Sequence, residues 1–147
     1  MTGTNSCFDR RSMEYQEFLN RMQHASELMQ AAHLQEAVDF LYLLFLSEIS
    51  DIDKVIICTD LATVYDRMGK TDEAISWFDK GVDLEQNYSR FEISEHKAQY
   101  LAQLGQTMDA VRIYENLIKQ PFVMEADKER MRKILQTLLG QTMRQWQ

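Results

Sequence analysis

The sequence predicts an all-α protein on three observations. The chain of 147 residues is rich in helix-forming Leu, Met, Gln, Glu and Ala. It has only five glycines and one proline, fewer chain breakers than strand-and-turn folds need. Its apolar residues recur at spacings of three and four, and a helix–turn–helix pattern returns after 36 or 37 residues, as in helical repeat proteins.

The chain begins with a polar stretch that has no period, so residues 1–12 are predicted to be a flexible arm before a single domain, 13–147. The helical period starts at Met13. The next predicted helix, Leu34–Ile49, is apolar on most sides and must be covered on more than one face. Its composition also suits a buried strand, but its length and helical flanks favour a helix. The apolar face of the first helix carries Phe18, Met22, Ala25 and Met29.

A glycine separates the next two predicted helices. Ser50 is a candidate N-cap for a helix that continues to Met68, and Gly69 suits the residue that ends it. The following helix begins at Thr71, with two acidic residues in its first turn, at the positive end of the helix. It fades in the polar run Glu85–Arg90, which predicts a loop.

Three more helices complete the chain, over Phe91–Leu104, Thr107–Lys119 and about Met124–Met143. Gly105 ends the first of them and Pro121 the second. The last has one apolar stripe opposite a charged face, so we expect it to cover the open end of the repeats.

The six helices before the last form three similar pairs. Small residues stand where the two helices of a pair would touch, and a larger side chain fills the space beside them. Four positions recur at fixed spacings in each pair. The second helix begins with an alanine, which stands twelve residues after another alanine, five after a small turn residue and four before a large side chain. In chain order these four positions are Ala25, Ala32, Ala37 and Leu41; Ala62, Gly69, Ala74 and Phe78; and Ala98, Gly105, Ala110 and Tyr114.

This pattern resembles the tetratricopeptide repeat (TPR), with copies at about 18–51, 55–88 and 91–124. The resemblance implies a right-handed α-α superhelix of three helix-turn-helix repeats with a C-terminal capping helix at about 124–143. The first copy departs from the family with Ala32 in place of glycine. Such arrays serve many functions, so the resemblance implies the fold more specifically than the activity. The central copy matches best, through Leu61, Ala62, Tyr65, Gly69, Ala74 and Phe78.

The charge argues against nucleic acid as the main ligand. The net charge is −7, and Glu48–Glu95 holds twelve acidic residues against five basic ones, whereas phosphate contacts need Lys and Arg. This acidity suits a basic or apolar protein segment, or it simply keeps a small helical protein soluble. With two unpatterned cysteines, no signal-like start and no apolar run of membrane length, the sequence predicts a cytoplasmic protein.

No catalytic or cofactor motif is found: GxSxG, the P-loop and GxGxxG are all absent. His24, His33 and His96 lack the spacing of metal ligands. Cys58 is interpreted as a small core residue rather than a nucleophile. The sequence therefore predicts a protein that is not an enzyme and binds no cofactor or metal.

The family resemblance implies that the first helix of each pair lines a concave groove. Part apolar and part acidic, with adaptable methionines, this groove suits a peptide or helix with apolar anchors and some basic residues. An ordinary solvated helix face would give the same residues. The predicted partner-binding residues are Met22, Ser26, Met29, Ile56, Thr59, Thr63, Asp66, Glu92, Glu95 and Gln99.

One use known in the family can be tested on the sequence. Members that bind the C-terminal carboxylates of heat-shock chaperones use Lys, Asn and Arg in the groove. Acids at some of these positions would repel a carboxylate, so we reject this use. The matching positions here hold Met22, Ser26, Asp60, Glu92 and His96.

The leading hypothesis is a protein-interaction module, adaptor-like or chaperone-like, that holds a segment of a partner protein in the groove. Small stand-alone proteins that resemble this chain include bacterial type III secretion chaperones, whose size and acidity are compatible with it. The alternative is a structural role: self-association into a homodimer or scaffold through the apolar helix Leu34–Ile49 and Trp146 near the C-terminus.

Overall fold

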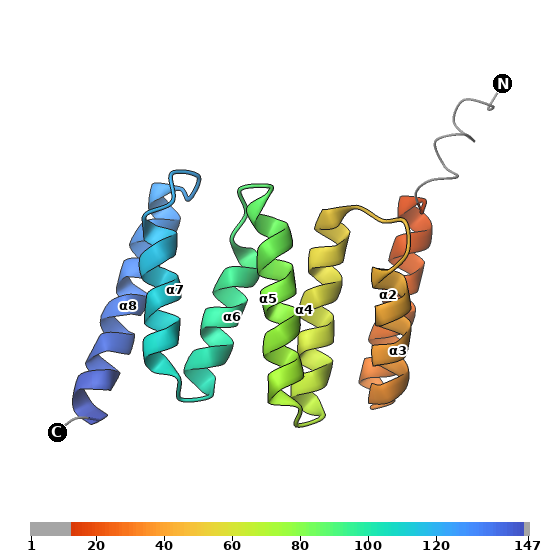
Figure 1. Ribbon diagram of the computed structural model, residues 1–147, viewed down its shortest axis with the longest axis horizontal. Helices are drawn as coiled ribbons and strands as arrows, with labels where there is room; N and C mark the ends of the chain where they lie inside the picture. Colours follow the sequence, from red (N-terminus) through yellow and green to blue (C-terminus); the bar gives the residue numbers. More distant parts are fainter. Residues whose placement is uncertain (1–12, 146–147) are drawn as a thin grey trace. The chain divides into compact units, whose positions relative to one another are not determined.

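The structure, a computed structural model, describes residues 13–145, and these form helices joined by short turns (Figure 1). No β-strand occurs among the described residues, which confirms the predicted all-α class. The predicted arm, 1–12, and Trp146 lie outside them. The helices are α2 (Tyr15–Gln30), α3 (Leu34–Phe45), α4 (Asp51–Arg67), α5 (Thr71–Gln86), α6 (Glu92–Gln103), α7 (Thr107–Ile118) and α8 (Glu125–Gln145).

The chain divides into two compact units, with the boundary after Leu84. The first unit contains α2, α3, α4 and most of α5. The second begins at Glu85, in the last turn of α5, and contains α6, α7 and α8. Of the helices in the described part, none is long and apolar enough to span a bilayer.

The turn that ends the first helix of each pair has the same backbone conformation in all three copies. Gly69 and Gly105 have φ angles of 75° and 85°, and Ala32 takes the same left-handed conformation with φ of 61°. In each copy the next N–H donates to a carbonyl five residues earlier, at 2.9 Å, as in a Schellman motif. The glycine pattern therefore predicts these helix ends correctly, and Ala32 keeps the turn despite its Cβ.

The six alanines at the predicted helix contacts are core residues. None of them has exposed surface: Ala25, Ala37, Ala62, Ala74, Ala98 and Ala110. Their larger neighbours Leu41, Phe78 and Tyr114 are buried as well. In the first unit one core cluster joins three helices, through Phe18 and Ala25 of α2, Ala37, Val38, Leu41 and Leu44 of α3, and Ile57, Leu61 and Val64 of α4.

Some helix boundaries differ from the predicted ones, and one predicted cap is confirmed. The helix expected over Leu34–Ile49 ends at Phe45, where an unbroken apolar run offers no stop signal. The helix predicted over Thr107–Lys119 begins at Thr107 and ends at Ile118, and its N-cap residue Gln106 makes no side-chain bond. The Ser50 cap is confirmed, since its hydroxyl accepts from the N–H of Asp53 at 3.1 Å.

The polar run predicted as a loop, Glu85–Arg90, begins inside a helix. α5 continues through Gln86, and Glu85 is almost fully buried. Its carboxylate accepts from the N–H groups of Ile93 at 3.1 Å and Ser94 at 2.9 Å, and from the Ser94 hydroxyl. Glu85 thus satisfies the first turn of α6, whose N-cap residue provides no side-chain bond.

Candidate functional site

The predicted partner-binding residues are distributed over both units. The structure brings together seven of them on two helices of the first unit and places the other three on one helix of the second unit. Met22, Ser26 and Met29 lie on α2; Ile56, Thr59, Thr63 and Asp66 lie on α4; Glu92, Glu95 and Gln99 lie on α6.

Helices α2 and α4 are neighbours in the first unit. Both contribute to its core cluster, and the half-buried Met22 and Met29 pack against that cluster. Arg67 of α4 donates from Nη1 to the carbonyl oxygen of Met29 at 2.9 Å. The two helices run in the same direction, because α3 returns the chain between them (Figure 1).

The exposed face of α4 offers hydrogen-bond acceptors. The hydroxyl of Thr59 donates to the carbonyl of Val55 at 3.3 Å, and that of Thr63 donates to the carbonyl of Thr59 at 2.9 Å. Since each hydroxyl uses its single hydrogen within the helix, only oxygen lone pairs remain for a ligand. Ile56 lies on the same face and is 45% exposed.

Asp60 is the most unusual group on this face, and it is absent from the predicted site. It follows Ile56 by four residues and precedes Thr63 by three, which places all three on one side of α4. Its side chain is half-buried, and burial raises the pKa of its carboxyl to about 6. No hydrogen bond or ion pair to this carboxylate is formed within the described part of the chain.

Helix α2 carries two exposed apolar residues that the sequence analysis missed. Tyr15 is 69% and Leu19 is 40% exposed. With Met22 and Ser26 they follow spacings of four, three and four, one stripe along the helix. The spacing alone indicates this stripe, whereas the family resemblance implies only the groove positions.

The stripe lies on the α4 side of α2. Each residue of an α-helix is rotated by about 100° from the one before it. On α2 this places His24 on one side of the buried face formed by Phe18 and Ala25, and the stripe from Tyr15 to Ser26 on the other side. His24 contacts the ring of Phe40 in α3, with centroids 4.8 Å apart, so the other side faces α4. We call the "α2–α4 surface" the set Tyr15, Leu19, Met22 and Ser26 of α2 with Ile56, Asp60 and Thr63 of α4.

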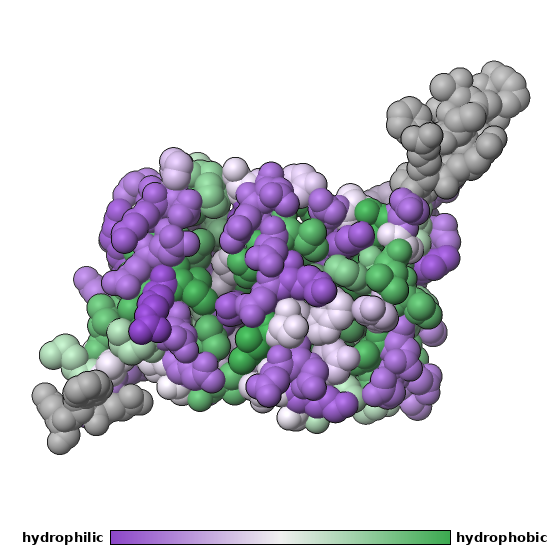
Figure 2. All heavy atoms as spheres, in the orientation of Figure 1, coloured by the Kyte–Doolittle hydropathy of each residue, from purple (hydrophilic) through white to green (hydrophobic). Residues whose placement is uncertain are grey.

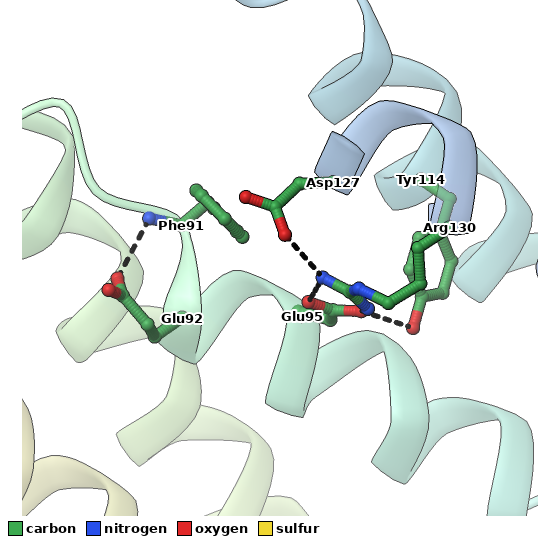
Figure 3. Close-up of polar contacts among 6 residues, drawn as sticks. All are labelled: Phe91, Glu92, Glu95, Tyr114, Asp127 and Arg130. Carbon is green, nitrogen blue, oxygen red and sulfur yellow. Dashed lines mark hydrogen bonds and ion pairs between the residues drawn. The ribbon is translucent and has the colours of Figure 1, made fainter. Parts of the chain in front are cut away.

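On α6, two of the three predicted residues are exposed. Glu92 accepts from the N–H of Phe91 at 3.1 Å (Figure 3) and pairs with Arg90 at 3.4 Å. Gln99 is also exposed. Both are available to solvent, but Glu92 already has contacts at the start of its own helix.

Glu95 does not lie on an open face as expected; it is 7% exposed. Figure 3 shows its carboxylate facing Arg130 of α8 and Tyr114 of α7. Arg130 donates to both of its oxygens, with Nη2 2.9 Å from Oε1, and the Tyr114 hydroxyl donates to Oε2 at 3.3 Å. Asp127 accepts a longer bond from Arg130 at 3.5 Å. Glu95 therefore joins the helices of the second unit, and Arg130, on the helix whose charged face the sequence predicts, is one of its partners.

The two partners of Glu95, Tyr114 and Arg130, keep their protonation states at neutral pH. Burial, followed by the negative charge of Glu95, raises the pKa of Tyr114 to about 12. The hydrogen bond to Glu95 raises the pKa of Arg130 above its usual value. Tyr114 therefore stays neutral and Arg130 stays charged at neutral pH, so neither is ready to transfer a proton.

Neither a metal-binding cluster nor a reactive thiol is found among the described residues. They contain no cluster of three His, Cys, Asp or Glu side chains placed to hold a metal ion. Cys58 is buried, and this burial raises the pKa of its thiol to about 12, against a smaller lowering by Lys80. A thiol of that pKa is not a nucleophile at neutral pH. What the first unit does present is a surface with apolar contacts and acceptor oxygens.

Comparison of the chain with protein-family models, with curated proteins and with solved structures finds no match.

Proposed function

We propose that this protein is a non-enzymatic protein-interaction module that binds an apolar, basic segment of a partner protein on the α2–α4 surface. The observation that carries the proposal is the group of exposed apolar side chains beside acceptor oxygens on two neighbouring helices. Tyr15, Leu19 and Ile56 are each at least 40% exposed, and gathered exposed apolar residues in soluble domains mark interaction sites.

The charge of the first unit supports a basic partner. Residues 13–84 contain fourteen acidic and five basic residues. This excess raises the local concentration of a positively charged segment and speeds its association. Arg67, the basic residue that continues the α4 stripe, donates to the carbonyl of Met29.

The proposed role is that of an adaptor or chaperone within a TPR-like helical array. The thioether of Met22 can adjust to different apolar side chains. The proposed compartment is the reducing cytoplasm, where a free buried thiol such as Cys58 is ordinary. Glu92 and Gln99 belong to the second unit, and the proposal does not depend on them.

Display selection against the full chain tests the proposal. A random library of peptides of about twelve residues, helices of which would span about 18 Å, is selected on the wild-type protein. Fluorescence anisotropy then compares the best peptides on wild type, Ile56→Glu and Leu43→Glu. The last is a matched control, since Leu43 is also an exposed aliphatic residue on a helix of the first unit, at 68%.

We expect Ile56→Glu to weaken binding by about tenfold or more, equal to about 1.4 kcal/mol, and Leu43→Glu to leave it unchanged. If the library yields no binding peptide, or if both variants weaken binding equally, the proposed surface is not the site.

A second candidate function, self-association, is favoured by the outer side of α3. Tyr42, Leu43 and Leu46 are 45%, 68% and 61% exposed, and Figure 2 shows hydrophobic residues gathered over α3. Trp77 lies beside them, with its ring 6.0 Å from that of Tyr42. Sedimentation equilibrium separates the candidates, because self-association through α3 requires a dimer that Leu43→Glu dissociates and Ile56→Glu does not.

A further inference from the structure

We propose that Asp60 binds one lysine or arginine side chain of the bound segment. This basic side chain would lie between the apolar side chains of α2 and α4. This inference rests on the proposed function and names the chemistry of its partner. It assigns a role to a residue that the sequence analysis left out of the site.

No described residue of the first unit compensates the charge of Asp60. Removing a carboxylate from water without a partner is costly, and Asp60 is half-buried with no bond to another described residue. Its nearest charged neighbours on the same side of α4 are Asp53 and Arg67. Each is seven residues away, about 10 Å along the helix, and Arg67 donates to Met29.

The neighbouring helices offer no cation either. The α4-facing stripe of α2 contains no charged residue, and α3 contains only acidic ones, Glu36 and Asp39. On α5, Lys80 lies over the rings of Phe45 and Trp77 and acts on the thiol of Cys58. Cys58 faces away from Asp60 on α4, two residues and about 200° around the helix. The described residues of the first unit therefore provide no cation for Asp60, and we assign this role to the bound segment.

The hydrogen bond of Arg67 also marks where α4 meets α2. Arg67 reaches the carbonyl of Met29, so α2 and α4 meet near these two residues. Asp60 and Met22 each lie two turns earlier on their own helix, and because the two helices run in the same direction both lie toward the same end of the unit from this bond. In the proposed complex, the basic side chain lies between Met22 of α2 and the carboxylate of Asp60 of α4.

Lysine and arginine side chains have the shape that fits beside Asp60. Lysine and arginine have a long apolar stem and a charged tip. The stem would contact Leu19, Met22 and Ile56, while the tip would bind Asp60 and donate to the free lone pairs of the Thr63 hydroxyl. A neutral donor would leave the carboxylate charge unpaired, and a single carboxylate is too few ligands for a metal ion.

The partner is a protein segment in which this basic residue has apolar neighbours. Such a residue supplies the countercharge, and its neighbours cover the exposed rings and aliphatic groups of Tyr15 and Ile56. Because the cation binds the ionised carboxylate, affinity should fall as the pH drops through about 6, where the unbound Asp60 takes up a proton.

The test uses the full chain and the same random peptide library. The library is selected separately on wild type and on Asp60→Asn, and the frequency of Lys and Arg in the selected peptides is compared with the starting library. The best peptide is then made with its basic residue and with norleucine, an uncharged side chain of similar length. Asp83→Asn, an exposed acid of α5, is the matched control.

We expect enrichment of Lys or Arg on wild type and its loss on Asp60→Asn. Wild type and Asp83→Asn should bind the basic peptide about tenfold more tightly than the norleucine peptide, and Asp60→Asn should bind the two equally. The thermal midpoint of Asp60→Asn should not fall, whereas a residue that only maintains the fold would lose stability together with binding.

The failures can be told apart. If no peptide binds, both the proposed function and this inference are overturned. If peptides bind in an Ile56-dependent way without preferring a basic residue, only the role of Asp60 is overturned. A wild-type dimer that Asp60→Asn dissociates would make a second copy the occupant, and this also overturns the inference.

Discussion

Arg130 of α8 donates to both carboxylate oxygens of Glu95 of α6, thirty-five residues earlier in the chain. The two partners differ in exposure, since the side chain of Arg130 is 46% exposed and that of Glu95 only 10%. Removing one or the other should therefore have unequal effects. A buried carboxylate without its cation is costly, whereas a half-exposed guanidinium can return to water.

We predict that Arg130→Ala lowers the free energy of unfolding by about 2 kcal/mol, because Glu95 keeps only the hydroxyl of Tyr114. Glu95→Gln should cost less, about 1 kcal/mol, because it leaves no buried charge. Urea unfolding of the single variants and the double variant measures both effects. Arg132→Ala is the control, since that exposed pair with Glu125 and Glu129 should contribute nothing measurable. Equal losses for Arg130→Ala and Glu95→Gln would contradict the proposed asymmetry.

Glu85 is predicted to stabilise the start of α6. Glu85→Ala removes the acceptor of the Ile93 and Ser94 N–H groups and should cost about 2 kcal/mol. Hydrogen exchange should show faster exchange of these two amides. Glu115→Ala, an exposed acid of α7, should change neither quantity, and unchanged protection in Glu85→Ala would count against the capping role.

The three equivalent turns provide a matched test of backbone strain. Ala32→Gly should raise the free energy of unfolding by about 1 kcal/mol, because glycine adopts positive φ without a Cβ penalty. Gly69→Ala and Gly105→Ala should lower it by a similar amount. No atom lies within 4 Å of a Cβ built at either glycine, so the effect measures the backbone alone. Thermal unfolding of the three variants checks this, and a loss of stability in Ala32→Gly would contradict it.

Asp60 should make stability depend on pH. Its pKa is about 6 in the folded protein and about 3.9 when unfolded. Below about pH 4 the Asp60 carboxyl is protonated in both the folded and the unfolded protein, so no buried charge lowers the free energy of unfolding. As the pH rises from about 4 to about 6, the unfolded state loses its proton first, and the free energy of unfolding falls.

Replacing the carboxylate removes this penalty. Asp60→Asn should therefore be more stable than wild type by about 1–2 kcal/mol at pH 7 and equal to it at pH 4. Urea unfolding at the two pH values, with Asp83→Asn as the control, makes the comparison. A variant that is less stable than wild type at pH 7 would show that the carboxylate has a stabilising partner.

Much of the fold could be predicted because it depends on local chemistry. Ser50 starts a helix with its own hydroxyl, and Gly69 and Gly105 end helices through φ angles that glycine adopts freely. The paired small residues, such as Ala62 and Ala74, are buried as their spacing indicates. The end of α3 at Phe45 was missed, because an apolar run is equally compatible with helix and turn.

The candidate site was predicted less well. The residues on α2 and α4 lie on neighbouring helices, but Glu95 proved to be an internal ion-pair partner, and Tyr15, Leu19 and Asp60 were left out. The periodic pattern shows which side of a helix is polar. It does not show whether a polar group on that side meets water, an arginine from a distant helix or an apolar wall.

The sequence by itself determined the helices, their pairing and the small residues at their contacts, since caps, turns and periodicity act within a few residues. Only the tertiary structure decided the roles of the acids. Glu85 binds the start of the next helix, Glu95 binds Arg130, and Asp60 is half-buried with no cation from the described residues beside it. Burial and pairing depend on residues far apart in the chain, so three carboxylates that look alike in sequence differ in the folded protein.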